Sequence, residues 1–274
     1  MRALLLLIAS WLCAPAALAA IASPNVAEAI VLKHFEARNR ADPDALLAVL
    51  SPDVQIYERP NGPHRLVGLL SDQVGTHDRV RNYFRDEFQK PRPRHEIVDM
   101  VSLGELVVSR AAITLPDHTP PDHVLTAFRV RDGAIDRIWH IAMVEDATPD
   151  LGADAQAVTR QLQIAANRAD ADGFVGLFHD DARHFHPRRD PSVLGGAPSP
   201  KVFDRASRTR AHREMFANGP TAQVRITDSV ALGEWVADIE EFRFPDGRIE
   251  DHLTINRVRD GLILDTWHLA DQER

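Results

Sequence analysis

Apolar side chains recur along the chain at two different spacings, and both spacings appear twice. Spacings of three and four positions are typical of an amphipathic helix, whereas strict alternation is typical of a half-buried strand. The helical spacing predicts three helices in each half of the chain, over residues 24–40, 43–50, 78–89, 153–168, 170–178 and 205–217. Alternation predicts five strands in each half, over residues 54–58, 95–103, 105–115, 123–131, 135–144, 182–186, 222–232, 234–244, 249–258 and 262–270.

Both halves place most helices before a run of consecutive strands, which is typical of α+β folds and not of alternating α/β folds. We expect each half to form a twisted, curved antiparallel sheet with three helices packed on it. Such a half-open cone has an apolar interior that the long helix closes, so it offers a site for a small molecule. The predicted fold is therefore α+β, with two tandem cone-shaped domains.

A repeated phrase indicates that the two halves are copies of one domain. Val-Arg-Asp-Gly occurs at 130–133 and again at 258–261, which is 128 residues later. A Trp-His pair follows each phrase, at 139–140 and at 267–268. Repetition at this length indicates a duplicated domain and not a short solenoid repeat.

The first residues of the chain differ from both copies. A positively charged start precedes an apolar run over residues 3–12, and the Ala-Leu-Ala of 17–19 fits the small-x-small rule for signal cleavage. We therefore expect residues 1–20 to be a signal peptide and the mature protein to be periplasmic or secreted; an uncleaved membrane anchor is the alternative. The single cysteine, Cys13, lies in this segment, which excludes disulfides and thiol catalysis from the mature chain.

The repeat and the charge pattern together bound the domains and the partners. We assign a first domain to residues 24–147, a linker to 148–153 and a second domain to 154–274. The formal net charge is −8 at pH 7, and the charges are interspersed without a basic stripe. We therefore expect no nucleic-acid partner, and no membrane contact after signal cleavage. The expected partner is a small apolar molecule.

The order of elements and three phrases resemble the SnoaL-like branch of the nuclear transport factor 2-like superfamily. The phrases are residues 39–46 at a helix junction, residues 51–54 before the short strand, and residues 131–139 leading into the last strand. The resemblance covers both copies. It implies the cone fold but leaves the chemistry open, because the superfamily includes polyketide cyclases, ketosteroid isomerase, scytalone dehydratase and binders without activity.

The resemblance also implies candidate catalytic residues in each copy. The general base of ketosteroid isomerases corresponds to Glu58, and to His186 in the second copy. The acid–base aspartate of SnoaL cyclases corresponds to His140 and His268, and a histidine can transfer protons near neutral pH. One of the isomerase's oxyanion donors corresponds to His34.

The candidate ligand-binding residues lie on the helices and strands that should face the interior of each cone. They are Thr126, Trp139, Phe84, Leu162, Thr254 and Phe174. Alternation along the last strand nevertheless places Trp139 on the face opposite His140, together with Ile141 and Met143. Buried against Trp267 and Leu269, this stripe would join the two sheets back to back, so we expect an internal pseudo-dimer that is a monomer in solution.

Individual residues leave alternatives open. Glu58 is either an inward carboxylate with a raised pKa, coupled to His34 or His140, or a solvated charge beside Arg59. His140 either transfers protons or only closes the cone.

A metal site is the weaker alternative for the histidines of the second copy. His184 and His186, with His179 or His268, have the residue types for zinc. No carboxylate is fixed beside them in the sequence, so we expect neither a metal nor a cofactor.

These patterns favour an exported SnoaL-like protein that binds a small apolar ligand in a cone-shaped pocket. One alternative is a cofactor-free acid–base enzyme, an isomerase, dehydratase or polyketide-cyclase-like lyase, that uses His140 and Glu58. Another is a structural or assembly role with vestigial pockets. Because the isomerase's donor residues are not matched, binding is favoured over catalysis.

Overall fold

The computed structural model describes residues 25–62, 64–88, 92–116, 120–145, 152–186, 194, 198–199 and 204–274. The expected signal peptide, its cleavage site and most of the expected linker lie outside the described residues. No helix in the described ranges is both long enough and apolar enough to cross a membrane.

Each half of the chain forms an α+β domain with the same order of elements, as the sequence predicts. The first domain comprises α1 (Val26–Arg40), α2 (Pro43–Ala48), β1 (Leu50–Tyr57), α3 (His77–Glu87), β2 (Arg94–Leu103), β3 (Leu106–Thr114), β4 (Asp122–Arg131) and β5 (Ala134–Val144). The second domain comprises α4 (Ala153–Asn167), α5 (Ala171–Gly176), β6 (Phe178–Phe185), α6 (Arg205–Phe216), β7 (Gln223–Leu232), β8 (Trp235–Arg243), β9 (Ile249–Arg259) and β10 (Leu262–Glu273).

The two sheets have the same topology, with strand orders β1-β5-β4-β3-β2 and β6-β10-β9-β8-β7. Consecutive strands pair antiparallel, as expected. The first strand of each domain departs from the expected antiparallel order, because β1 pairs parallel to β5 and β6 pairs parallel to β10. Each sheet is therefore mixed, and the helices cover its concave face.

The first strand of each domain is longer than the sequence predicts, because β1 begins at Leu50 and β6 at Phe178. We expected the Ser-Pro-Asp of residues 51–53 to end the helix and lie outside the strand. β1 is an edge strand, and its register with β5 is irregular between Leu50 and Gln55. A proline at an irregular edge position costs no sheet hydrogen bond, so Pro52 is accommodated within the strand.

Short polar signals in the sequence fix the ends of the elements. The side chain of Asp42 accepts a hydrogen bond from the backbone N–H of Ala45 at 2.9 Å, which caps α2 as its position before Pro43 predicts. Asp132 and Gly133 have φ values of 51° and 78°, the left-handed conformations that a tight hairpin between β4 and β5 requires.

The sequence Asn-Arg-Ala-Asp occurs at residues 39–42 and again at 167–170, and the contacts of its asparagine explain the recurrence. The side chain of Asn39 donates to the backbone oxygen of His95 at 2.7 Å and accepts from the backbone N–H of His95 at 2.8 Å. Asn167 makes the same pair of bonds to Val224, at 2.8 and 2.7 Å. Each asparagine thus ties the end of the long helix to the edge strand of its sheet.

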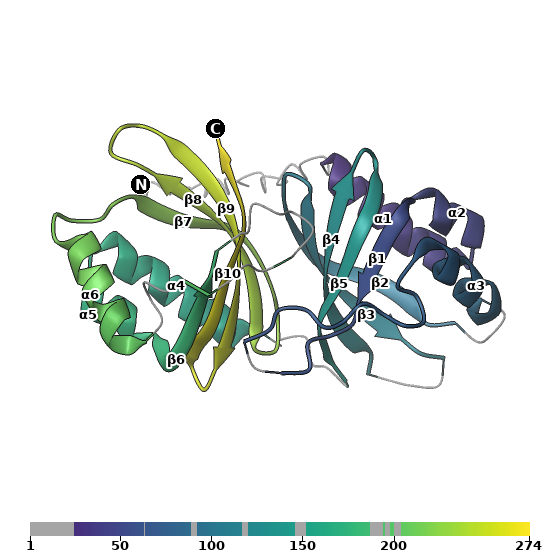
Figure 1. The fold of residues 1–274 in the computed structure, drawn as a ribbon, viewed down its shortest axis with the longest axis horizontal. Helices are drawn as coiled ribbons and strands as arrows, with labels where there is room; N and C mark the ends of the chain where they lie inside the picture. Colours follow the sequence, from purple (N-terminus) through teal and green to yellow (C-terminus); the bar gives the residue numbers. More distant parts are fainter. Residues whose placement is uncertain are drawn as a thin grey trace, which may run out of the picture.

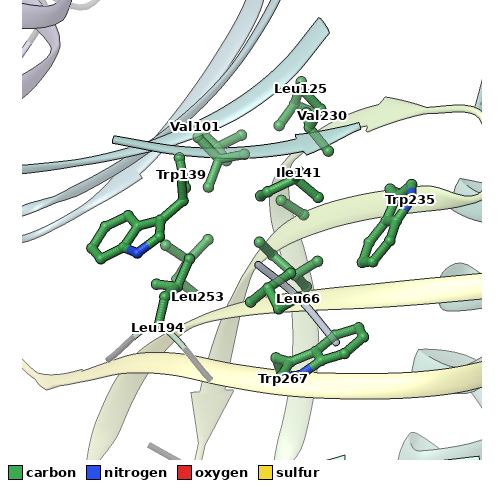
Figure 2. Close-up of a cluster of buried hydrophobic side chains, with 14 of the residues drawn as sticks. Leu66, Val101, Leu125, Trp139, Ile141, Leu194, Val230, Trp235, Leu253 and Trp267 are labelled. Atoms are coloured by element: carbon green, nitrogen blue, oxygen red, sulfur yellow. The ribbon is translucent and has the colours of Figure 1, made fainter. Parts of the chain in front are cut away.

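The two sheets pack against each other, with the helices on the outer sides of the molecule (Figure 1). The shared core contains apolar side chains from both sheets, including Trp139, Ile141 and Trp267, each at most 2% exposed (Figure 2). Leu66 and Leu194, which are 128 residues apart in the sequence, add one side chain each from the loops. This core confirms the expected internal pseudo-dimer.

Candidate functional site

In each domain a pocket lies between the helices and the concave face of the sheet. The first-domain pocket has a volume of about 220 Å³, and the second-domain pocket has a volume of about 370 Å³. The sheets meet through their opposite faces, so the two pockets lie on the far sides of the shared core. Because the two domains have the same topology, each residue that lines one pocket can be compared with the residue at the equivalent position of the other.

Alternation along β5 brings His140 into the first pocket. Its Nδ1 atom lies 3.3 Å from the hydroxyl oxygen of Thr126 on β4. Burial, and then the positive charge of Arg38, lower the pKa of His140 to about 4, against a smaller raising effect of Glu58. His140 is therefore a neutral imidazole at neutral pH. Phe84 of α3 lines the same pocket.

His34 lies on α1 in the first pocket and is 4% exposed. Its Nδ1 atom has no hydrogen-bond partner among the described residues, and its ring contacts Phe35 and Phe128 edge-on. Burial, and then the charge of Arg38, lower its pKa well below the usual value. The expected His34–Glu58 couple therefore does not form.

Glu58 lies at the mouth of the first pocket, because it follows the last residue of β1, Tyr57. Its side chain is exposed, so the expectation of an inward carboxylate is wrong. The solvated alternative agrees with this exposure.

Trp139 does not line either pocket, which corrects its inclusion among the ligand-binding residues. It is 1% exposed in the core between the sheets, where its ring stacks on Tyr57 with centroids 6.2 Å apart. The reason is the alternation of β5: the strand turns His140 inward, and its neighbour must point outward.

The second-domain pocket contains all five site residues that the sequence indicated for this domain: Leu162, Phe174, His186, Thr254 and His268. The ring of His186 stacks on that of His268, with centroids 5.4 Å apart and an interplanar angle of 12°. The hydroxyl oxygen of Thr254 lies 3.3 Å from Nδ1 of His268, which repeats the contact between Thr126 and His140.

A carboxyl group that the sequence analysis missed completes the second pocket. Glu240 of β8 accepts a hydrogen bond from the hydroxyl of Thr254 at 2.8 Å, through its Oε2 atom. Its other oxygen has no hydrogen bond with the described residues. Burial, and then the neighbouring charge of Asp238, raise the pKa of Glu240 to about 7. Glu240 is therefore poised to exchange a proton near neutral pH.

These contacts define the direction of the hydrogen bonds when Glu240 is charged. The hydroxyl of Thr254 donates to the carboxylate, so its oxygen can accept from Nδ1 of His268. Burial, and then the neighbouring His186, lower the pKa of His268 to about 4, so its ring is neutral. A neutral ring with a proton on Nδ1 leaves Nε2 as an acceptor. When Glu240 is protonated on its other oxygen, Thr254 can still donate to Oε2, so the pocket then holds a proton donor, Glu240, and an acceptor, Nε2 of His268.

The two pockets diverge at residues that a comparison of the halves reveals. Glu240 corresponds to Ala111 at the offset of 129 residues that relates these strands, so the first pocket has no equivalent carboxyl group. Arg38 corresponds to Ala166 at the offset of 128, so the second pocket has no equivalent cation. Reading the halves against each other for charged replacements would have identified both residues.

Further histidines make the second pocket rich in imidazole groups. His184 and His212 also line it, and burial lowers the pKa of both. Among the residues that the structure describes, no group of three or more His, Cys, Asp or Glu side chains is arranged to hold a metal ion.

Comparisons with known proteins assign a family to both domains. The model of the SnoaL-like domain matches residues 31–138 and again residues 158–266. No curated protein matches the sequence.

Solved structures resemble single domains of this chain, with about a fifth of the aligned residues identical. An LEH-like epoxide hydrolase from M. tuberculosis has 19% identity and a TM-score of 0.35, over 42% of this chain and 81% of its own. A Δ5-3-ketosteroid isomerase from Mycobacterium sp. has 19% identity and a TM-score of 0.33, over 44% of this chain and 98% of its own. An uncharacterized cystatin-fold protein from Novosphingobium aromaticivorans has 19% identity and a TM-score of 0.35, over 44% of this chain and 100% of its own.

Proposed function

Because the chain belongs to the SnoaL-like domain family, with one such domain in each half, we propose that it binds a small, mainly apolar molecule in the pocket of its second domain. The observation that carries this proposal is the half-buried Glu240 carboxyl group in an otherwise largely apolar pocket of about 370 Å³. The ligand that matches this pocket is a compact hydrocarbon skeleton with one carbonyl oxygen.

The size and lining of the pocket support the apolar part of the ligand. Small-molecule sites in proteins range from about 300 to 1,000 Å³ and combine an apolar lining with a few polar groups. Leu162, Phe174 and Phe216 contribute such a lining here, from three different helices. The first pocket, at about 220 Å³, is below that range.

The polar end of the pocket supports the carbonyl oxygen. A protonated Glu240 keeps its contact with Thr254 through one oxygen and can donate its proton from the other. A buried donor without an acceptor is costly, so a carbonyl oxygen at this position is favoured over a purely apolar ligand by about 1–3 kcal/mol.

Acid–base catalysis is the second candidate function. For this function, Glu240 and His268 of the second pocket are favoured over the expected pair of His140 and Glu58. Glu240 titrates near neutral pH, and His268 is neutral with an accepting nitrogen. A proton donor and a proton acceptor in one pocket are what an isomerase or dehydratase requires. If this pocket performs catalysis, Glu240 and His268 are the acid and the base.

Export to the periplasm or outside the cell is part of the proposal. It is supported by the signal-like composition of residues 1–20.

Binding of a matched pair of compounds tests the proposed function. We would titrate the mature protein with 2-decalone and with decalin, which differ by one carbonyl oxygen, and follow the amide signals by NMR. The expected result is that both perturb signals around Phe174 and His268, with decalone binding about tenfold more tightly, which is the value of one buried hydrogen bond.

Glu240→Leu should remove the preference for decalone and leave decalin binding intact. Signals that shift in the first domain alone, or an equal preference for both compounds in the wild type, would contradict the proposal.

A further inference from the structure

The first pocket contains a cation that no protein group neutralises. Arg38 of α1 reaches into the pocket, and its guanidinium lies 5.4 Å from the ring centroid of Phe84. Within the part of the chain that the structure describes, the guanidinium of Arg38 forms no ion pair and no hydrogen bond. Burial lowers its pKa to about 10, so it remains charged at neutral pH. Arg38 is half-buried, and a partly desolvated charge without a partner is costly, so a ligand anion would reduce that cost.

The groups around Arg38 do not supply the missing negative charge. His34, His95 and His140 line the same pocket, and burial followed by the charge of Arg38 lowers the pKa of all three. They are therefore neutral at neutral pH. Glu58, the one carboxylate in the lining, is exposed at the mouth, as is the adjoining Arg59. Water screens both of these charges.

Unused hydrogen-bonding atoms accompany the cation. His34 and His95 are 4% and 5% exposed, and the Nδ1 atom of each lacks a hydrogen-bond partner among the described residues. The rest of the pocket wall is mostly apolar and includes Val80 of α3 and Phe128 of β4. The pocket thus combines one cation and free imidazole nitrogens with an apolar body.

We propose that the first-domain pocket is a binding site for a small organic carboxylate, with Arg38 as its counterion. A guanidinium matches the two oxygens of a carboxylate in one plane. An apolar cavity of about 150 Å³ holds benzene, so a pocket of about 220 Å³ accommodates a body of that size together with a carboxylate group. This site is separate from the proposed second-domain site, where Ala166 takes the place of Arg38.

The test uses benzoate and its neutral analogue benzamide on the full mature protein, with calorimetry for affinity and NMR for location. Benzoate should bind at least tenfold more tightly than benzamide and should perturb signals of the first domain. Arg38→Gln should weaken benzoate binding at least tenfold. Arg40→Gln is the matched control, because Arg40 lies exposed in the last turn of the same helix, and it should leave the affinity unchanged.

A second readout separates a direct role of Arg38 from a structural one. A bound carboxylate offsets the charge that lowers the pKa of His140, so benzoate should raise that pKa in the wild type. Arg38→Gln should itself raise the pKa of His140 without any ligand. The variant should keep the unfolding temperature of the wild type, because it removes a half-buried cation whose guanidinium has no partner among the described residues.

Three results would overturn the proposal. They are equal affinity for benzoate and benzamide, benzoate binding that survives Arg38→Gln, and perturbations confined to the second domain. Inorganic phosphate binding as tightly as benzoate through Arg38 would also contradict it, because the apolar body would then contribute nothing.

Discussion

At the scale of single residues, one charged replacement in each domain distinguishes two pockets that otherwise share their architecture. Thr126 and Thr254 hold His140 and His268 at the same distance of 3.3 Å. Only Thr254 also contacts a carboxyl group, that of Glu240. The threonines at this equivalent position therefore have different electrostatic roles in the two domains.

Thr254→Val tests this role directly. The hydroxyl of Thr254 stabilises the charged form of Glu240 and so lowers its pKa, against the larger raising effect of burial. Removing the hydroxyl should move the midpoint of the Glu240 carboxyl titration upward from about 7. The measurement is ¹³C NMR of the side-chain carboxyl over pH. Thr126→Val should leave that midpoint unchanged, and a downward movement in Thr254→Val would contradict the account.

At the scale of elements, the alternation of one strand assigns neighbouring residues to different parts of the molecule. On β5, Trp139 enters the core between the sheets while His140 enters the first pocket. On β10, Trp267 and His268 repeat this division. A shift of the pairing register by one residue in either strand would move the core-facing side chains to the pocket and the pocket-facing side chains to the core.

Trp139→Ala and His140→Ala should therefore have different effects. Loss of the buried indole should lower the free energy of unfolding by about 3–5 kcal/mol, which is typical of a large aromatic residue replaced by alanine in a core. His140→Ala should cost clearly less, because its side chain is only half-buried at the wall of a pocket. Urea unfolding of both variants is the measurement. Equal costs would indicate that the faces of β5 are assigned wrongly.

The elements and the packing of the two sheets followed from the sequence because spacing and repetition are local signals. The strand faces of Trp139 and His140 followed from alternation alone. The exposure of Glu58 did not, because it depends on where β1 ends relative to the pocket mouth, and a strand end is set by pairing with the distant β5. Glu240 and Arg38 were missed because a charged side chain in a strand or helix pattern is usually solvated.

At the scale of the whole molecule, duplication lets one chain bury both sheets without a second subunit. Trp139, Trp235 and Trp267 are each at most 5% exposed within a single chain. Single copies of such sheets would leave these rings in water. Light scattering should therefore give the mass of one chain in solution, and the mass of two chains would contradict an interface that is already complete.

Export is also a property of the whole molecule. N-terminal sequencing of protein recovered from the periplasm or the medium should start just after Ala19 or Ala20. Exported protein that still begins at Met1 would contradict cleavage, and would favour the uncleaved anchor.

The proposed ligand site depends most directly on the proton of Glu240, so the pH dependence of decalone binding is the measurement that tests the account best. A carbonyl oxygen binds the protonated carboxyl, so affinity should be full at pH 5 and fall as pH rises through about 7. In Glu240→Gln the amide donates at every pH, so its affinity should stay constant. Wild-type affinity that is flat or rises with pH, or a Glu240→Gln profile with the same fall, would contradict the account.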